Sequence, residues 1–511
     1  MSRGVFRSHN KVGETMSFQT NSDSGTTFDP TVTFLSGSDR VSWDLGIGNG
    51  YIADSSLSYS YPDTGTTKTV TLRTNKLSNL YGVTFNFDNI VGNLNMTGWD
   101  NLGGSFNVTS NPELTGITHT TSTEGFYYYN AQSCNLTGNH DMSMFPNLGG
   151  TLLLGSNSEL TGVTHTTSTQ VFSSYQIQTC NLIGNHDVSM FPNLGGDFRI
   201  HNNSALTGIT HTASTQIFSN YYAHSCNLTG NHDMSMFPNL GGNVYIYNNS
   251  ALTGITHTAS TQTFSNYWVI NCNLTGNHDV SMFPNLGGVF WIRDNTALTG
   301  ITHTASTEVF TIYKAHDCDL TGNFDLSMLT GLGGQFECNN NPSLTSISHG
   351  TSSEVFTRYW ANNCNLGGPP LDVSMLSALG GSFDVSSNSG LRSVTFPYTT
   401  QTFANSSGGN SAIDLSACNL DSTTDFWRLS GITMDVNSTH GADIQMQNSG
   451  LSKPTVDAYL SDFSGITTNN LTRWSGVTLN IGGTNAAPSA AGLASVAYLT
   501  GATAQWTVTI S

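Results

Sequence analysis

The sequence predicts a mainly β protein built as a solenoid, with a small β-sandwich-like segment before it and an α/β cap after it. Cysteines recur every 46 residues and an asparagine lies midway between them, so the unit is a turn of 23 residues in two alternating forms. A period of this length is typical of a solenoid. Apolar and polar residues alternate before each marker, which indicates a short strand in every turn. The markers are Asn111, Cys134, Asn157, Cys180, Asn203, Cys226, Asn249, Cys272, Asn295, Cys318, Asn341 and Cys364.

Each turn carries two apolar residues two positions apart, then the marker, then leucine. Side chains two apart on a strand share a face, so Phe106 and Val108 are expected to face the core ahead of Asn111. A buried asparagine can bond backbone groups that an irregular bend leaves unpaired, and a small thiol can fill the same position in alternate turns. In this pattern the chain resembles the leucine-rich-repeat family over roughly residues 80–450.

The solenoid is expected to span residues 77–450 and to be irregular at its ends. Asp88 stands where the first turn should carry Asn or Cys, and a one-residue insertion at 367–372 precedes turns of uneven spacing. Residues 1–28 are expected to form an N-terminal arm. Residues 451–511 should cap the open core, because a Ser-Lys-Pro helix start and two strand-like runs flank a segment of helical spacing. This last segment resembles the tail of leucine-rich-repeat proteins of Bacteroidota phages and their hosts.

Residues 29–76 contain two strand-like stretches around turns rich in Gly and Pro. They resemble the second half of a PKD-type immunoglobulin-like β-sandwich. The matching positions are Trp43, Asp44, Gly46, Gly48, Tyr59, Tyr61, Pro62, Gly65 and Val70.

Composition excludes several classes of function. The 511 residues include 33 Asp and Glu against 15 Lys and Arg, a formal charge of −18, which argues against binding nucleic acid. No stretch approaches the roughly 20 apolar residues of a membrane span, and the start of the chain lacks the apolar region of a secretory signal. We therefore expect a soluble chain without membrane insertion, not exported by an ordinary signal route.

The recurring cysteines and histidines are expected to be structural. Ladder cysteines on every second turn are about 10 Å apart, beyond disulfide reach, so we expect buried free thiols. The histidines recur in the same context and equivalents cannot share one ion, which favours a role in loop structure. The alternative is weak cation binding along an aspartate ladder. The two ladders are His119, His165, His211, His257, His303, His349 with His140, His186, His232, His278, and Asp141, Asp187, Asp233, Asp279, Asp325.

No motif for a nucleophile, phosphate loop, metal centre or paired carboxylates stands out. We therefore expect a protein that is not an enzyme and takes no cofactor or metal.

Repeats that are otherwise almost identical differ chiefly at strand positions expected to face solvent. Aromatic residues, Arg and His gather there, and these types are enriched at binding hot spots. The alternative is that they tile the sheet and support strand pairing. The candidate receptor-binding residues are Arg199, His201, Tyr222, His224, Tyr245, Tyr247, Trp268, Ile270, Trp291, Arg293, Lys314, His316 and Trp360.

These observations lead to the hypothesis of a phage virion protein, a tail, fibre or spike adhesin that binds a glycan or protein receptor on the host surface. Other virion proteins are expected to bind its N-terminal region, where Arg3, Arg7 and Lys11 lie, and a homotrimer is one assembly to test. A bacterial cell-surface adhesin and an architectural virion or filament subunit are the alternatives. A glycan-cleaving enzyme ranks last.

Overall fold

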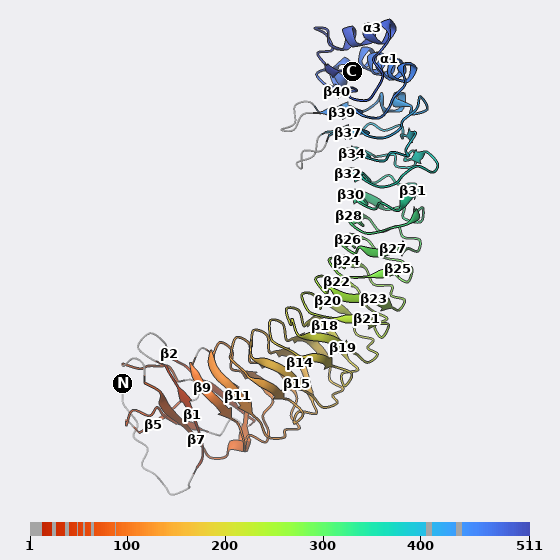
Figure 1. The fold of residues 1–511 in the computed structure, drawn as a ribbon. Helices are drawn as coiled ribbons and strands as arrows, with labels where there is room; N and C mark the ends of the chain where they lie inside the picture. Colours follow the sequence, from red (N-terminus) through yellow and green to blue (C-terminus); the bar gives the residue numbers. More distant parts are fainter. Residues whose placement is uncertain are drawn as a thin grey trace. The chain divides into compact units, whose positions relative to one another are not determined.

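The computed structural model describes residues 13–22, 27–35, 40–48, 50–54, 57–62, 66–86, 88–404, 411–435 and 442–510. The chain divides into two compact units, residues 1–240 and 241–511. Each unit contains a parallel sheet of stacked strands, one strand from every turn, with short strand pairs on the opposite side of the turns (Figure 1). The predicted β-solenoid of 23-residue turns is therefore confirmed.

In the first unit the parallel sheet runs through consecutive turns in chain order, each strand pairing with the next. The opposite side holds two-stranded parallel pairs, β13 with β15 and β17 with β19. The sheet strands are β8 (Leu80–Thr84), β10 (Gly104–Asn107), β12 (Phe126–Asn130), β14 (Leu148–Leu153), β16 (Phe172–Gln176), β18 (Leu194–Arg199) and β20 (Phe218–Tyr222). The opposite strands are β13 (Gly138–Asp141), β15 (Leu160–Thr164), β17 (Gly184–Asp187), β19 (Leu206–Thr210) and β21 (Thr229–Met234).

A six-stranded sheet in the first unit joins N-terminal strands to β9 and β11 of the first solenoid turns, in the spatial order β11, β9, β1, β7, β4, β5. Its strands are β1 (Glu14–Thr20), β4 (Val41–Asp44), β5 (Tyr51–Ala53), β7 (Lys68–Thr74), β9 (Ile90–Asn95) and β11 (Glu113–Thr118). The smaller elements are β2 (Thr27–Phe28) paired with β6 (Tyr59–Ser60), β3 (Thr31–Phe34) antiparallel to β8, and a 3₁₀ turn at Leu77–Asn79.

Strand β1 corrects the expected N-terminal arm. Its seven residues pair antiparallel with β7, and Met16 and Phe18 alternate with exposed neighbours and are buried. The sheet therefore begins inside the range assigned to the arm, because this alternation gives β1 an apolar face to bury. Arg3, Arg7, Lys11 and Gly65 lie outside the described residues.

The second unit continues the same architecture and ends in helices. Its sheet strands are β22 (Gly242–Tyr245), β24 (Phe264–Trp268), β26 (Gly288–Trp291), β28 (Phe310–Lys314), β30 (Leu332–Glu337), β32 (Phe356–Trp360), β34 (Ser382–Asp384), β37 (Ile413–Asp414), β39 (Asp443–Gln445), β40 (Thr478–Asn480) and β41 (Thr507–Thr509). The opposite strands are β23 (Ala251–His257), β25 (Thr275–Asp279), β27 (Ala297–Thr302), β29 (Gly322–Leu326), β31 (Leu344–His349), β33 (Leu371–Asp372), β35 (Val394–Thr395), β36 (Thr402–Phe403) and β38 (Thr433–Met434).

The helices lie at the end of the chain, as the sequence predicts. They are α1 (Lys453–Asn469), α2 (Leu471–Trp474) and α3 (Ala490–Leu499), with a 3₁₀ turn at Phe426–Leu429. Ser452 caps α1 by accepting a hydrogen bond from the backbone N–H of Thr455, and Pro454 lies in the first turn.

Every regular turn bends at its marker, and the marker side chain bonds backbone groups that the bend leaves unpaired. The residue before it has a left-handed backbone, for example Ser156 with φ of 61°. Asn157 donates to the carbonyls of Leu154 (2.7 Å) and Ala131 (2.9 Å) and accepts from the N–H of Leu136. In the alternate turns the cysteine Sγ contacts a carbonyl instead, as Cys134 does with Val108 at 3.1 Å. All eight cysteines are free and buried, which confirms the expected structural thiols.

Candidate functional site

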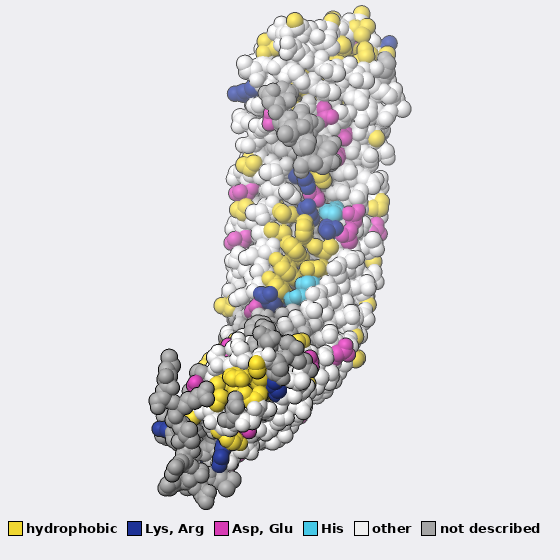
Figure 2. Space-filling model, turned by 90° about the vertical axis from the view of Figure 1, so that its left-hand side faces the viewer, with side chains coloured by type: hydrophobic (Ala, Val, Ile, Leu, Met, Phe, Trp, Pro, Cys, Tyr) yellow, Lys and Arg dark blue, Asp and Glu magenta, His cyan; other side chains and the backbone are white. Residues whose placement is uncertain are grey.

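The outer face of the parallel sheet in the second unit carries a single file of variable side chains. Parallel pairing in register places each beside its equivalent in the next turn, while the intervening residues, such as Phe290 and Ile292, are fully buried. The file is Tyr245, Trp268, Trp291, Lys314, Glu337, Trp360 and Asp384. Figure 2 shows hydrophobic side chains gathered on this face over the strands of the second unit, beside Lys, Arg and His.

The aromatic rings of this file pack against one another, stacked at Tyr245 and Trp268 and tilted by 50° at Trp268 and Trp291. The centroids of Tyr245 and Trp268 are 4.5 Å apart with the rings inclined at 28°, and those of Trp268 and Trp291 are 4.8 Å apart. Beyond Trp291 the column continues with cations, since the Lys314 Nζ lies 5.0 Å and the Arg293 guanidinium 5.5 Å from the Trp291 ring centroid. The column is therefore held together by ring stacking and cation–π contacts within the protein.

A charged cluster adjoins the aromatic column. Glu337 is only 4% exposed. One oxygen of its carboxylate lies 2.6 Å from Arg358 and 3.1 Å from Lys314, and the other oxygen lies 3.6 Å from His316. Arg358 also lies over the Trp360 ring, 3.9 Å from its centroid. Such a carboxylate is tolerable in a buried position because its charge is paired.

The candidate residues of the first unit form a cluster of their own. Arg199 pairs with Asp197 at 2.8 Å and lies 5.0 Å from the Tyr222 ring centroid. The His201 and His224 rings stack at 4.4 Å, and burial lowers the pKa of each to about 4. Both imidazoles are therefore neutral at pH 7.

Twelve of the thirteen candidate residues are half-buried on the outer face of the sheet in their own unit. Ile270 is the exception, because it is only 8% exposed. The equivalent residues of the adjacent turns are Tyr247 and Arg293. Their longer side chains flank Ile270 and shield it from solvent. Ile270 is therefore corrected from a solvent-facing residue to a buried one.

Sequence reasoning did not select Glu337, Arg358 and Asp197 as site residues, although they hold the cations and rings in place. Glu337 follows Lys314 by one turn, and opposite charges at equivalent positions of adjacent strands are a signal for an ion pair. Asp197 and Arg358 lie two residues before Arg199 and Trp360, at a second outward position of the strand. Comparison of the later position alone therefore did not reveal them.

The side chains of the recurrent histidines are buried or half-buried beside the core, and His119, His165, His211 and His303 lie in loops directly after a strand. His119 and His140 both place Nε2 against the hydroxyl of the buried Tyr129, at 2.8 and 2.9 Å, and the arrangement repeats in later turns. Burial lowers the pKa of His140 to about 4. The expected structural role is thus exerted through a buried His–Tyr–His network, which local sequence cannot show because its members come from different strands.

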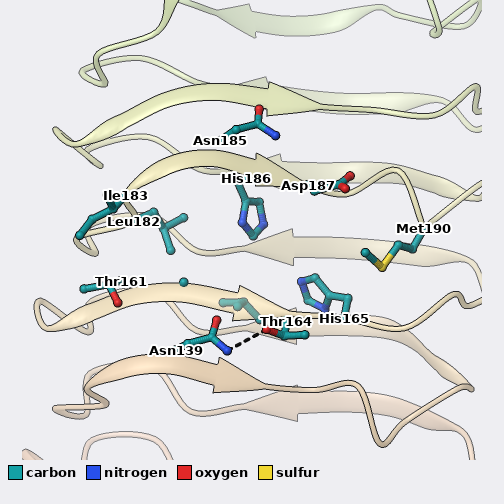
Figure 3. A pocket seen from close by; sticks show the side chains of 12 residues that line it. Asn139, Thr161, Thr164, His165, Leu182, Ile183, Asn185, His186, Asp187 and Met190 are labelled. Carbon is teal, nitrogen blue, oxygen red and sulfur yellow. Dashed lines mark hydrogen bonds between the residues drawn. The ribbon is translucent and has the colours of Figure 1, made fainter.

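A shallow pocket lies beside this network, between β15 and β17. Figure 3 shows His165 and His186 within it, and the bond of 2.7 Å between Asn139 and Thr164 at its border. Equivalent pockets occur two turns earlier and further along, in the second unit. The lining of each combines Asn, Thr and Gly with His and apolar side chains, and in the pocket of Figure 3 the one carboxylate, Asp187, accepts a hydrogen bond from the N–H of Ser189. The lining lacks the pair of carboxylates that glycoside hydrolysis uses.

No helix of the described residues is long and apolar enough to cross a bilayer. Comparison of the chain with protein-family models, curated proteins and solved structures gave no match. The fold and the outer face of the sheet therefore define the class as a β-solenoid with a variable, aromatic and charged sheet surface.

Proposed function

We propose that the protein is a non-enzymatic recognition protein of a phage virion, a tail, fibre or spike adhesin. The outer face of the sheet binds a host-surface receptor, a glycan or a protein. The observation that carries this proposal is the contrast between nearly constant turns and the variable file from Tyr245 to Trp360. Large half-buried aromatic residues and arginines are the side chains that dominate binding energy in interfaces.

We place the solenoid with the leucine-rich-repeat proteins, of the type found in phages and surface adhesins of Bacteroidota. The asparagine and cysteine markers at the bend, each bonded to backbone carbonyls, support this assignment. The segment at residues 29–76 is assigned as a partial PKD-like unit on its buried Trp43 and Tyr61.

The first experiment is mass spectrometry of phage particles purified from the lysate. Recovery of the chain as a stoichiometric component supports the virion assignment. Its absence from particles, with recovery on the surface of intact bacteria, would favour the alternative of a bacterial cell-surface adhesin.

The second experiment compares adsorption to host cells by the purified wild-type protein and by Trp268→Ala and Trp291→Ala. We expect both variants to lose binding while retaining the circular dichroism spectrum of the wild type. Tyr398→Ala is the matched control, because Tyr398 is 76% exposed and lies between β35 and β36, away from the file. Unchanged adsorption by both tryptophan variants would favour the architectural alternative, in which the ring column supports the sheet.

A further inference from the structure

We propose that the partner of the sheet face in the second unit is a protein surface with an apolar centre and a basic rim. This inference rests on the proposed recognition function and narrows its receptor, which that function leaves as glycan or protein. It follows from which parts of the rings and charges remain available to a partner.

The ring faces are already occupied. Trp268 lies between Tyr245 at 4.5 Å and Trp291 at 4.8 Å, and Trp291 has Lys314 and Arg293 over its ring at 5.0 and 5.5 Å. Recognition of a sugar by an aromatic residue needs an open ring face on which the sugar can stack. Ring faces covered by neighbouring rings and cations in this way offer a glycan little of this contact.

The cations of the face are also occupied. Arg293 is paired with Asp294, and Lys314 and Arg358 share the buried Glu337 carboxylate. An acidic polysaccharide or a nucleic acid would have to displace the Glu337 carboxylate from Lys314 and Arg358, and opening these buried charge pairs is costly. An anionic polymer is therefore a poor fit to this face.

What remains available matches the anatomy of a protein interface. Ring edges of Tyr245, Trp268 and Trp291 form an apolar centre, and the indole N–H groups of Trp268 and Trp291 have no acceptor among the described residues. Buried indole N–H groups usually bond an acceptor, so these two are unsatisfied in the described part of the free protein. At the border, Asp294 contacts Arg293 and Asp317 contacts His316, yet the side chains of the two aspartates remain 36% and 40% exposed. Aromatic centres with polar rims are typical of protein–protein interfaces, and the exposed carboxylates favour Lys or Arg opposite them.

The test measures binding of the purified full-length protein to cells from a panel of Bacteroidota strains, treated in three ways. One sample is untreated, one is treated with a broad protease, and one is oxidised with periodate, which cleaves the vicinal diols of glycans. We expect protease to abolish binding and periodate to leave it within twofold. Binding that survives protease and is lost after periodate overturns the proposal in favour of a glycan and leaves the recognition function standing.

Variants add a second readout. Trp291→Ala should weaken binding at least 30-fold, and the double variant Asp294→Asn with Asp317→Asn should weaken it about fivefold and flatten its salt dependence, because the exposed carboxylates act by charge. The double variant changes only partly exposed side chains, which protects the test from a folding failure, and Tyr398→Ala should bind as the wild type does.

Equal binding of all variants to every strain refutes the recognition function itself. If Trp291→Ala loses binding and the double variant binds as the wild type does, the partner has no basic rim and the proposal is overturned. Sedimentation that reveals self-association sensitive to Trp291→Ala identifies a second copy of the chain as the occupant and also overturns the proposal.

Discussion

Acid should unfold the first unit through its buried histidines. His140, His186 and His232 each have a pKa lowered to about 4 by burial, against an ordinary value of 6.5, with a smaller opposing effect of the neighbouring aspartate. Between these values the unfolded chain binds more protons than the folded chain, so stability is complete above about pH 6.5 and falls as the pH falls toward 4. Linkage gives about 2 kcal/mol per histidine at pH 5, or about 6 kcal/mol for the three. That loss is comparable to the whole stability of a typical domain.

The chain supplies its own design for the variant. Phe324 stands where the four equivalent turns carry histidine, is buried, and lies 6.1 Å from the Tyr313 ring centroid. Tyr313 keeps its bond to His303 at 2.6 Å. Changing His140, His186 and His232 to Phe should therefore preserve the core and remove three of the buried titrating groups of the unit.

The assay is thermal unfolding by circular dichroism from pH 8 to pH 4.5. We expect the melting temperature of the wild type to fall steeply below pH 6.5 and that of the triple variant to fall less steeply, with the two proteins within a few degrees at pH 8. The variant still loses stability in acid because His119, His165 and His211, whose pKa burial also lowers, remain. A wild-type melting temperature that is flat down to pH 5 would refute the reasoning. So would a triple variant whose melting temperature falls in parallel with that of the wild type.

Three further predictions concern the bends of the solenoid. Asp88 occupies the asparagine position of the first turn, and burial raises its pKa to about 8, so at pH 7 folding requires proton uptake that costs about 4 kcal/mol. Asp88→Asn should therefore raise the free energy of unfolding in urea by about 2–4 kcal/mol at pH 7 and by less at pH 5. An equal gain at the two pH values would contradict the raised pKa of Asp88. Asn203→Ala removes hydrogen bonds of 2.7, 2.9 and 3.1 Å to buried backbone groups and should lower the free energy of unfolding by at least about 3 kcal/mol. Asn203→Cys introduces the residue of the alternate turns and should cost less. An equal loss of stability in the two variants would show that the bends do not accept the thiol. The eight buried cysteines should resist a thiol reagent such as dithionitrobenzoate in the native state and all react after unfolding in urea, and rapid labelling of folded protein would show that the bends open.

The regular part of the fold was readable because every turn repeats one local rule. A strand must alternate its faces, and the bend after it needs either an asparagine amide or a small thiol, so residues such as Phe106 and Asn111 reveal both the period and the core. The irregular ends were less readable. Strand β1 pairs with β7, 48 to 60 residues away, and such pairing depends on partners that local sequence does not identify.

The sequence by itself determined the solenoid, its turn length, the free thiols and the variable outer positions, because these depend on side chains at fixed spacing within one turn. Only the tertiary structure decided how side chains from different turns combine. A tilted ring contact joins Trp268 to Trp291, one carboxylate at Glu337 pairs with both Lys314 and Arg358, and Ile270 is shielded between longer neighbours. The same holds for the histidines, whose pKa and hydrogen bonds depend on burial beside a tyrosine of another strand. Contacts of this kind depend on rotamers and burial between turns, which a repeat pattern does not specify.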